Sequence, residues 1–286
     1  MALKFAIFGH PVGHSLSPVM HAANFAALGI DASYGRFDVP PEALREELAR
    51  CAGEGYSGLN VTMPHKKAIM PLLDSLAQSA IDAGAVNTVK FLPGGKTEGH
   101  NTDVGGFFAN LAERGVEIAG KKVAIAGCGG AGAALAAGFA RLPARSLHIL
   151  NRTPAKAVAL AERLAAGSSA GAVAGCAFAL SSPEAESVFR DADIIVNATS
   201  AGLKQDDASA IPSAAMHSGQ TVCDIVPVAR ETATVRAARS AGAVAIGGLG
   251  MLLRQAVLAF GIWTGLEPDV EAMRNALDSA MASGGK

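Results

Sequence analysis

The chain has 286 residues, of which 50% are hydrophobic and 17% are charged. This apolar content and a formal net charge of −1 exclude an intrinsically disordered chain. The balanced charge argues against nucleic acid as a partner. Charge-free stretches at residues 123–140 and 164–183 are dominated by Ala, Gly and Ser, so we expect no membrane span.

The N-terminal segment and the spacing of the cysteines indicate a cytoplasmic protein. The first apolar run stops at Gly9, which is not typical of a signal peptide. The four cysteines lie far apart without a C-x-x-C pair, so we expect small buried thiols rather than disulfides or a zinc site. The seven histidines show no metal-ligand spacing, and we expect no metal.

Short apolar runs alternate with helical patterns along the chain. Strands are predicted at residues 5–8, 59–62, 123–126, 147–150, 194–196, 222–226 and 244–246. Helical patterns lie between many of them, as at residues 22–28 and 155–164, and a long one covers residues 251–264. This alternation predicts an α/β fold with a parallel sheet covered on both faces. Residues 167–175 are expected to form a flexible surface loop.

The character of the sequence changes near residue 103. Before it, polar motifs follow the predicted strands, and after it a self-contained βαβ series begins at Lys121. We therefore predict two domains. Residues 1–103 with 249–286 form an N-terminal α/β substrate domain completed by C-terminal helices, and residues 104–248 form a Rossmann NADP-binding domain.

A glycine-rich motif directly follows the strand at residues 123–126. Residues 127–132, Gly-Cys-Gly-Gly-Ala-Gly, match the G-x-G-x-x-G fingerprint and precede a helix expected to begin near Ala133. Gly127 permits the tight turn, Gly129 lets a pyrophosphate approach, and Gly132 lets helix and strand pack closely. The helix N-terminus adds partial positive charge. Gly130 and Ala131 belong to the same predicted loop.

The end of the next strand distinguishes the two nicotinamide dinucleotides. An NAD enzyme places a carboxylate about 20 residues after the fingerprint, where this chain has Asn151, Arg152 and Thr153 with Lys156 beyond. A guanidinium suits a 2′-phosphate, which a carboxylate would repel. The sequence therefore predicts NADP as the cofactor.

Three polar motifs lie at the ends of predicted elements in the first hundred residues. They are residues 60–66 (Asn-Val-Thr-Met-Pro-His-Lys), 84–88 (Gly-Ala-Val-Asn-Thr) and 99–103 (Gly-His-Asn-Thr-Asp). Each alone has an ordinary structural explanation: amides bond turns, Asp103 caps the following helix, and Lys66 with Lys67 forms a solvated pair.

Taken together and in order, these motifs resemble the shikimate dehydrogenase family. The resemblance extends to Ser15-Leu16-Ser17-Pro18, to the motifs at residues 151–153 and 197–200, and to Gly248-Leu249-Gly250-Met251-Leu252 with Gln255. It implies the two-domain architecture described above and the NADP-linked interconversion of 3-dehydroshikimate and shikimate. The implied substrate is a small cyclohexene carboxylate, and the implied assembly is a monomer or homodimer.

The resemblance also implies roles for individual residues. Lys66 and Asp103 would form the catalytic acid–base pair. Substrate carboxylate and hydroxyls would be held by Ser15, Ser17, Thr62, Asn87 and Gln255, with Asn60 close by. Ser17 also fits an N-cap, because Pro18 suits the first position of a helix. Thr199, Val226 and Gly248 would lie beside the cofactor.

Three positions, in two segments, depart from the family pattern. Pro227 stands where the family often has a tyrosine, with Ala229 where a proline is expected, and Gly247 stands where an aspartate is common. These changes leave open a paralogue that prefers quinate or another shikimate analogue. A non-catalytic NADP-binding sensor is the alternative of a different class, although a sensor has no need to retain both Lys66 and Asp103.

Overall fold

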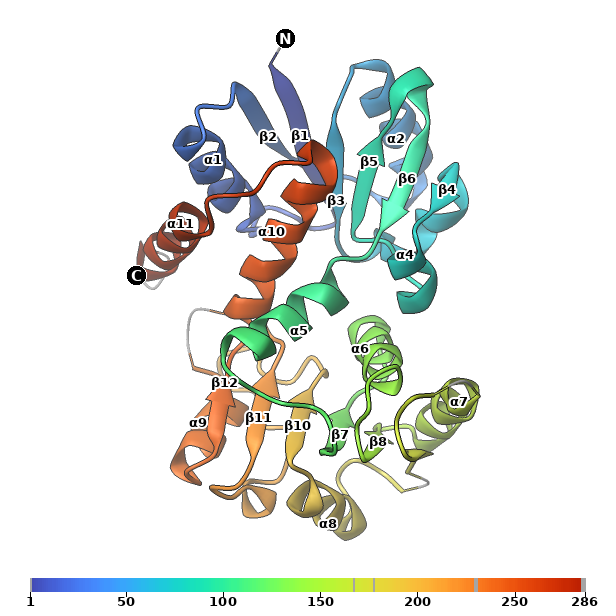
Figure 1. The fold of residues 1–286 in the computed structure, drawn as a ribbon, viewed down its shortest axis with the longest axis vertical. Helices are drawn as coiled ribbons and strands as arrows, with labels where there is room; N and C mark the ends of the chain where they lie inside the picture. The colour runs from blue at the N-terminus through green and yellow to red at the C-terminus, as the bar shows by residue number, and fades with distance from the viewer. Residues whose placement is uncertain (1, 167, 177, 229–230, 284–286) are drawn as a thin grey trace. The chain divides into compact units, whose positions relative to one another are not determined.

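The computed structural model describes residues 2–166, 168–176, 178–228 and 231–283. The chain divides into two compact units, drawn in Figure 1. Unit 1 comprises Met1–Gly106 and Leu252–Lys286, and unit 2 comprises Phe107–Met251. Both divisions fall three residues after the predicted boundaries at 103 and 248, since the first turn of a helix that starts at Asp103 packs within unit 1.

Unit 1 contains a mixed six-stranded sheet in the order β2-β1-β3-β5-β6-β4. The strands are β1 (Leu3–Gly9), β2 (Ala32–Asp38), β3 (Gly58–Val61), β4 (Ser75–Leu76), β5 (Thr88–Phe91) and β6 (Thr97–His100). β5 runs antiparallel to both β3 and β6, so the prediction of a parallel sheet is wrong for this unit. For β5 and β6 the physical reason is the turn Pro93–Gly95, where Gly94 and Gly95 take positive φ angles and reverse the chain.

Helices from both ends of the chain build the rest of unit 1. They are α1 (Ser17–Ala27), α2 (Leu44–Gly53), α3 (His65–Ala68), α4 (Gln78–Ala83), α10 (Leu249–Thr264) and α11 (Val270–Ser283), with short 3-10 turns at Pro41–Ala43 and Met70–Leu72. α10 starts in unit 2 and continues into unit 1. α1 packs against α11, where the Asp269 N–H donates to Asn24 Oδ1 at 2.7 Å.

A cluster of aromatic side chains joins α10 to the first strand. Phe5, Phe25, Phe260 and Trp263 share one core, and the Trp263 indole N–H donates to Val89 O at 2.9 Å. Gly58 makes this packing possible, because a Cβ there would lie 2.3 Å from the Trp263 ring. The prediction that C-terminal helices complete the first domain is confirmed.

Unit 2 contains a parallel six-stranded sheet in the order β12-β11-β10-β7-β8-β9, as predicted for a Rossmann-like domain. Its strands are β7 (Lys122–Ala126), β8 (Ser146–Leu150), β9 (Val173–Gly175), β10 (Ile194–Asn197), β11 (Thr221–Asp224) and β12 (Val244–Ile246). Its helices are α6 (Gly130–Ala140), α7 (Pro154–Ala165), α8 (Pro183–Asp191) and α9 (Ala233–Ser240), with a 3-10 turn at Ser213–Ala215. α5 (Asp103–Glu113) starts in unit 1 and continues into unit 2.

Strand β9 corrects the prediction of a flexible loop over residues 167–175. Residues 173–175 pair with β8 in parallel, and the Leu147 N–H donates to Ala172 O at 2.7 Å. Gly175 lets this edge strand approach α7, since a Cβ there would lie 2.4 Å from Ala157 O. Gly167 lies outside the described residues. Among the helices of the described ranges, none is long and apolar enough to cross a membrane.

One buried histidine gives unit 1 a pH-dependent stability. His21 is fully buried on α1, its ring stacks on Tyr34 with centroids 4.8 Å apart, and neither ring nitrogen has a hydrogen-bond partner among the described residues. Burial disfavours the imidazolium and lowers the pKa of His21 from 6.5 to about 3. The native state therefore keeps this ring neutral at mildly acidic pH.

We expect acid to destabilise the protein through His21. Between pH 6.5 and 3 the unfolded chain binds a proton at this ring that the native state does not, so stability falls with decreasing pH. Replacing His21 by Phe should reduce the slope of unfolding free energy against pH by about 1.4 kcal/mol per pH unit in this range. Urea unfolding at several pH values measures it. His14→Phe, at an exposed position, is the control, and equal slopes in the two variants would refute the assignment.

Candidate active site and nucleotide-binding loop

Two serines lie together where the loop after β1 leads into α1. The Ser17 N–H donates to Ser15 Oγ at 3.3 Å, and the Ser17 side chain is buried. From β2, Arg36 donates from Nε and Nη2 to Ser15 O at 3.2 and 2.9 Å. The prediction that Ser17 caps α1 is wrong: Leu16 is the N-cap residue, and no side chain caps the helix. Ser17 already lies inside the first turn of the helix.

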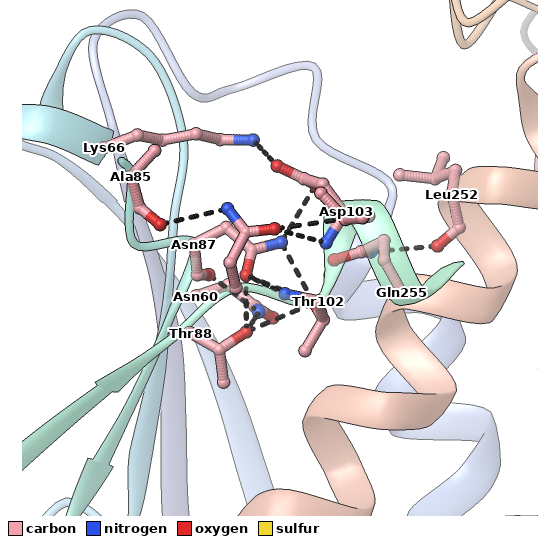
Figure 2. A network of polar contacts seen from close by, with 11 residues as sticks. Asn60, Lys66, Ala85, Asn87, Thr88, Thr102, Asp103, Leu252 and Gln255 are labelled. Carbon is pink, nitrogen blue, oxygen red and sulfur yellow. Dashed lines mark hydrogen bonds and ion pairs between the residues drawn. The ribbon is translucent and has the colours of Figure 1, made fainter. Parts of the chain in front are cut away.

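Two hydrogen bonds, one from the side chain of His65 and one to the main chain of Lys66, fix the position of α3. The neighbouring His65 is buried, with Nε2 lying 2.6 Å from Val39 O. The carbonyl of Lys66 itself accepts from the Val86 N–H at 2.8 Å. The short helix is therefore held on two sides, and the lysine side chain extends from it toward Asp103 (Figure 2).

The carboxylate of Asp103 lies at the start of α5, and it does not cap this helix. Asn101 takes that role, because its Oδ1 accepts from the N–H groups of Asp103 and Val104 at 3.1 and 3.3 Å. Asp103 Oδ2 instead contacts Lys66 Nζ at 2.6 Å. The side chains of Lys66 and Asp103 are 28% and 15% exposed, so a ligand can reach both.

A network of amides and hydroxyls supports this ion pair. Asn87 Nδ2 donates to Asp103 Oδ1 and to Thr102 Oγ1, each at 2.9 Å. Asn87 Oδ1 accepts from the Thr102 N–H at 2.8 Å and from Thr88 Oγ1 at 3.0 Å. Asn60 donates to Thr88 Oγ1 and to the Asn87 carbonyl at 3.3 and 3.2 Å. The structure thus connects Asn60, Asn87, Asp103 and Lys66 in one network (Figure 2).

The remaining predicted substrate residues, Thr62 and Gln255, lie in the same unit. Thr62 follows β3, and its Cγ2 comes so close to Gly9 that a Cβ there would lie 2.4 Å away. Gln255 lies on α10, with Nε2 donating to Leu252 O at 2.8 Å. Gly106 of α5 allows this helix to approach, because a Cβ would lie 2.6 Å from the Gln255 nitrogen. Neither Thr62 nor Gln255 is hydrogen-bonded to Lys66 or Asp103 in the network described above.

The glycine motif forms a tight loop between β7 and α6. Gly127 takes a φ of +101°, and a Cβ on Gly132 would lie 2.1 Å from Gly127 O. Space is open above Gly129 and Gly130. α6 begins at Gly130, three residues before the predicted start, and no side chain caps it. The loop therefore presents free N–H groups at a helix N-terminus, a geometry that fits a pyrophosphate.

The end of β8 lies against this loop. Asn151 Oδ1 accepts from the Cys128 N–H at 3.3 Å, and Asn151 Nδ2 donates to Thr153 O at 3.1 Å. Arg152 and Lys156 are exposed just beyond. Two exposed cations beside a loop of free N–H groups form a site suited to an anionic ligand with an additional phosphate.

Three further residues predicted to lie beside the cofactor line the same edge of the parallel sheet. Thr199 follows β10, where Oγ1 donates to Asn197 Oδ1 at 2.7 Å, and its methyl group lies against Gly127. Val226 and Gly248 contact each other: a Cβ on Gly248 would lie 2.5 Å from Val226 O. Both line a cavity of about 440 Å³.

The departures from the family pattern fall beside this cavity. β11 ends at Asp224 rather than at the predicted residue 226, because Asp224 Oδ1 accepts from the Val226 N–H at 3.1 Å and turns the chain. Pro227 is exposed after this turn. Gly247 lines the cavity and has open space where a side chain would lie. Ala229 lies outside the described residues.

Sequence reasoning missed two supporting side chains on β2. Tyr34 donates to Asn60 Oδ1 at 2.6 Å, and Arg36 holds the Ser15 carbonyl. If residues 32–38 are taken as a strand, their side chains alternate between its two faces, and positions two apart, such as Tyr34 and Arg36, share one face. This alternation was the available signal. Across the described ranges, no group of three His, Cys, Asp or Glu residues is arranged to hold a metal ion.

Comparisons with known proteins place the chain in a family. Residues 7–89 match the shikimate dehydrogenase substrate binding domain, residues 110–239 match shikimate / quinate 5-dehydrogenase, and residues 248–277 match the shikimate 5'-dehydrogenase C-terminal domain. A shikimate dehydrogenase (NADP(+)) of Rubrobacter xylanophilus is 46% identical over 272 residues, which cover 95% of this chain and 94% of that protein.

Solved structures agree with the sequence comparison. Shikimate 5-dehydrogenase from Thermus thermophilus, in complex with NADP(H) and shikimate, has a TM-score of 0.85 and 36% identity, and the match covers 97% of this chain and 99% of that one. The ligand-free 5-ketofructose reductase of a Gluconobacter species has a TM-score of 0.87 and 32% identity, covering 98% and 99%. From its motifs, fold and full-length relatives, the chain belongs to the shikimate dehydrogenase family.

Proposed function

We propose that the protein catalyses the NADP-linked interconversion of shikimate and 3-dehydroshikimate. The observation that supports this most directly is the 2.6 Å contact between Lys66 Nζ and Asp103 Oδ2. The chain that carries this contact belongs to a family whose members include a shikimate dehydrogenase (NADP(+)) that is 46% identical to it. A sensor that only binds the dinucleotide would not need an accessible amine and carboxylate held together.

The chemistry assigned to the pair follows from its geometry. Reduction of a ketone develops negative charge on the oxygen, which an ammonium within hydrogen-bond reach stabilises and protonates. Lys66 is the group suited to contact that oxygen, and Asp103 orients the ammonium and shares in the proton movement. In the oxidative direction, the pair accepts the proton of the alcohol. Asn87 keeps Asp103 in place through its 2.9 Å hydrogen bond.

The loop at residues 127–132 and the end of β8 are assigned to NADP. Its pyrophosphate fits the free N–H groups at the start of α6, and Arg152 with Lys156 suits the 2′-phosphate. Thr199, Val226 and Gly248 are assigned to the nicotinamide half. When bound, this cofactor supplies or accepts the hydride. Asn151 and Thr153 position the backbone at this edge of the sheet.

A carboxylated ring is the preferred substrate class. Ser15 and Ser17 provide two adjacent hydroxyls, and the Arg36 guanidinium bound to Ser15 O gives their surroundings positive charge. Thr62, Asn87 and Gln255 are assigned to ring hydroxyls, with Asn60 behind Asn87. The absent family tyrosine at Pro227 favours testing quinate beside shikimate. Because the chain is also similar to a 5-ketofructose reductase, a neutral polyol should be tested as a substrate beside shikimate and quinate.

We expect the Lys66→Ala variant to lose about 10²- to 10⁴-fold in kcat with a smaller change in the KM of shikimate. The reason is that, in the oxidation of shikimate, the developing alkoxide loses its positive partner and the alcohol loses the pair that accepts its proton. Initial rates of NADPH formation, followed by absorbance with shikimate and NADP⁺, measure the effect. The exposed neighbour Lys67 provides the matched control, and Lys67→Ala should keep wild-type rates. Near-normal turnover of Lys66→Ala would remove this lysine from the chemistry.

We expect the Arg152→Ala variant to raise the KM of NADP⁺ selectively, by about tenfold or more, since a charge-assisted contact to the 2′-phosphate is lost. The KM of NAD⁺ and that of shikimate should change little. Steady-state kinetics with both dinucleotides test this, with Arg163→Ala, in the last turn of α7, as the control. An unchanged NADP⁺/NAD⁺ preference would contradict the assignment.

A further inference from the structure

The structure contains a half-buried tyrosine that the assigned chemistry does not use. Tyr34 lies on β2, and the chain has only one other tyrosine. Its ring stacks on the buried His21, with centroids 4.8 Å apart and planes 9° from parallel, while its hydroxyl contacts Asn60 Oδ1 at 2.6 Å. Burial raises the pKa of Tyr34 well above its usual range, although nearby Ser17 and Arg36 oppose the shift. The phenol therefore keeps its proton.

The direction of the Tyr34 hydrogen bond follows from the other side of Asn60. The Asn60 amide lies 3.2 Å from the main-chain carbonyl of Asn87, which can only accept. The amino group of Asn60 must therefore face that carbonyl, and Oδ1 must face Tyr34. Asn60 is buried, so this oxygen requires a donor, and the Tyr34 hydroxyl is the donor.

The same logic fixes each following group. Asn60 donates to Thr88 Oγ1 at 3.3 Å, and the Thr88 hydroxyl donates to Asn87 Oδ1 at 3.0 Å and also lies 3.3 Å from Thr102 Oγ1. The Thr102 N–H also donates to Asn87 Oδ1, at 2.8 Å. The amino group of Asn87 is thereby turned to Asp103 Oδ1 at 2.9 Å. Figure 2 shows these contacts from Asn60 to Asp103.

We propose that Tyr34 is a positioning residue for the reaction, whose hydroxyl is the donor that the buried Asn60 Oδ1 requires and so holds the Asn60 amide against Thr88 and the Asn87 carbonyl, beside the contact of Asn87 with Asp103. The inference rests on the proposed function, because it assigns Asn87 to the substrate and Asp103 to the proton transfer. Tyr34 itself acts on the reacting atoms through Asn60, Thr88 and Asn87. It is distinct from the family tyrosine whose place Pro227 occupies.

Tyr34→Phe removes the hydroxyl and keeps the ring that stacks on His21. Asn60 Oδ1 is then a buried acceptor without its donor, and the amide turns to find another partner. The matched control is Tyr56→Phe, because the Tyr56 ring packs against Phe37 and its hydroxyl lies outside this network. Both variants lose one phenolic oxygen, so they differ only in which hydroxyl is lost.

In Tyr34→Phe we expect kcat/KM for shikimate to fall about 10- to 100-fold, through both a lower kcat and a higher KM. The KM of NADP⁺ should remain within about twofold of wild type, and Tyr56→Phe should match wild type throughout. A variant that is merely less stable would lose kcat through a smaller folded fraction and keep both KM values. Wild-type constants for shikimate in Tyr34→Phe would overturn the proposal.

A second measurement tests the hydrogen-bond network without turnover. In nuclear magnetic resonance spectra of the free protein, the Asn87 side-chain amide resonance, identified by its loss in Asn87→Ala, should move in Tyr34→Phe and stay in Tyr56→Phe. An unmoved resonance in Tyr34→Phe would overturn the proposal whatever the kinetics. If the wild-type protein turns over neither direction of the shikimate reaction, the proposed function fails, and the spectra still decide the role of Tyr34.

Discussion

The short contact between Lys66 and Asp103 is the interaction on which the site depends. The residues are 37 positions apart, and their backbones are fixed independently: the Lys66 carbonyl by Val86, and the start of α5 by Asn101. Both side chains are partly exposed. The pair therefore avoids the weak attraction of a fully solvated ion pair and the large desolvation cost of a fully buried one. An ammonium held in this way is both oriented and accessible.

Unit 2 could be predicted largely from sequence because its signals are local. The continuous apolar run of β7 leads directly into the glycine motif, and a strand, a turn and a helix N-terminus within a dozen residues fix one another. The start of α6 was still misplaced, because Gly130 and Ala131 carry no helix-start signal of their own. β9 was missed for a related reason: Val173–Gly175 is short, half-buried and glycine-containing, so composition favoured a loop.

Unit 1 was predicted less completely because its order comes from contacts between distant residues. β2 is a sheet-edge strand whose side chains alternate between half-buried and exposed, so it lacks the apolar run that marks a central strand. The residue types of the site were visible in motifs at residues 60–66, 84–88 and 99–103. Their partners were not, since an amide does not reveal from sequence which groups it faces. Asn101 as the cap of α5 and Tyr34 as the donor to Asn60 therefore emerged only from the structure.

The aromatic cluster that joins β1 to α10 has a consequence for biosynthesis. Phe5 and Phe25 are synthesised before the nucleotide-binding unit, whereas Phe260 and Trp263 are added after it. At usual elongation rates this interval lasts about 10 to 50 s. All strands and helices of the nucleotide-binding unit emerge within that time, so the unit encoded in the middle of the gene can finish folding first. The substrate half, although its first strand is made before that unit, is completed after it.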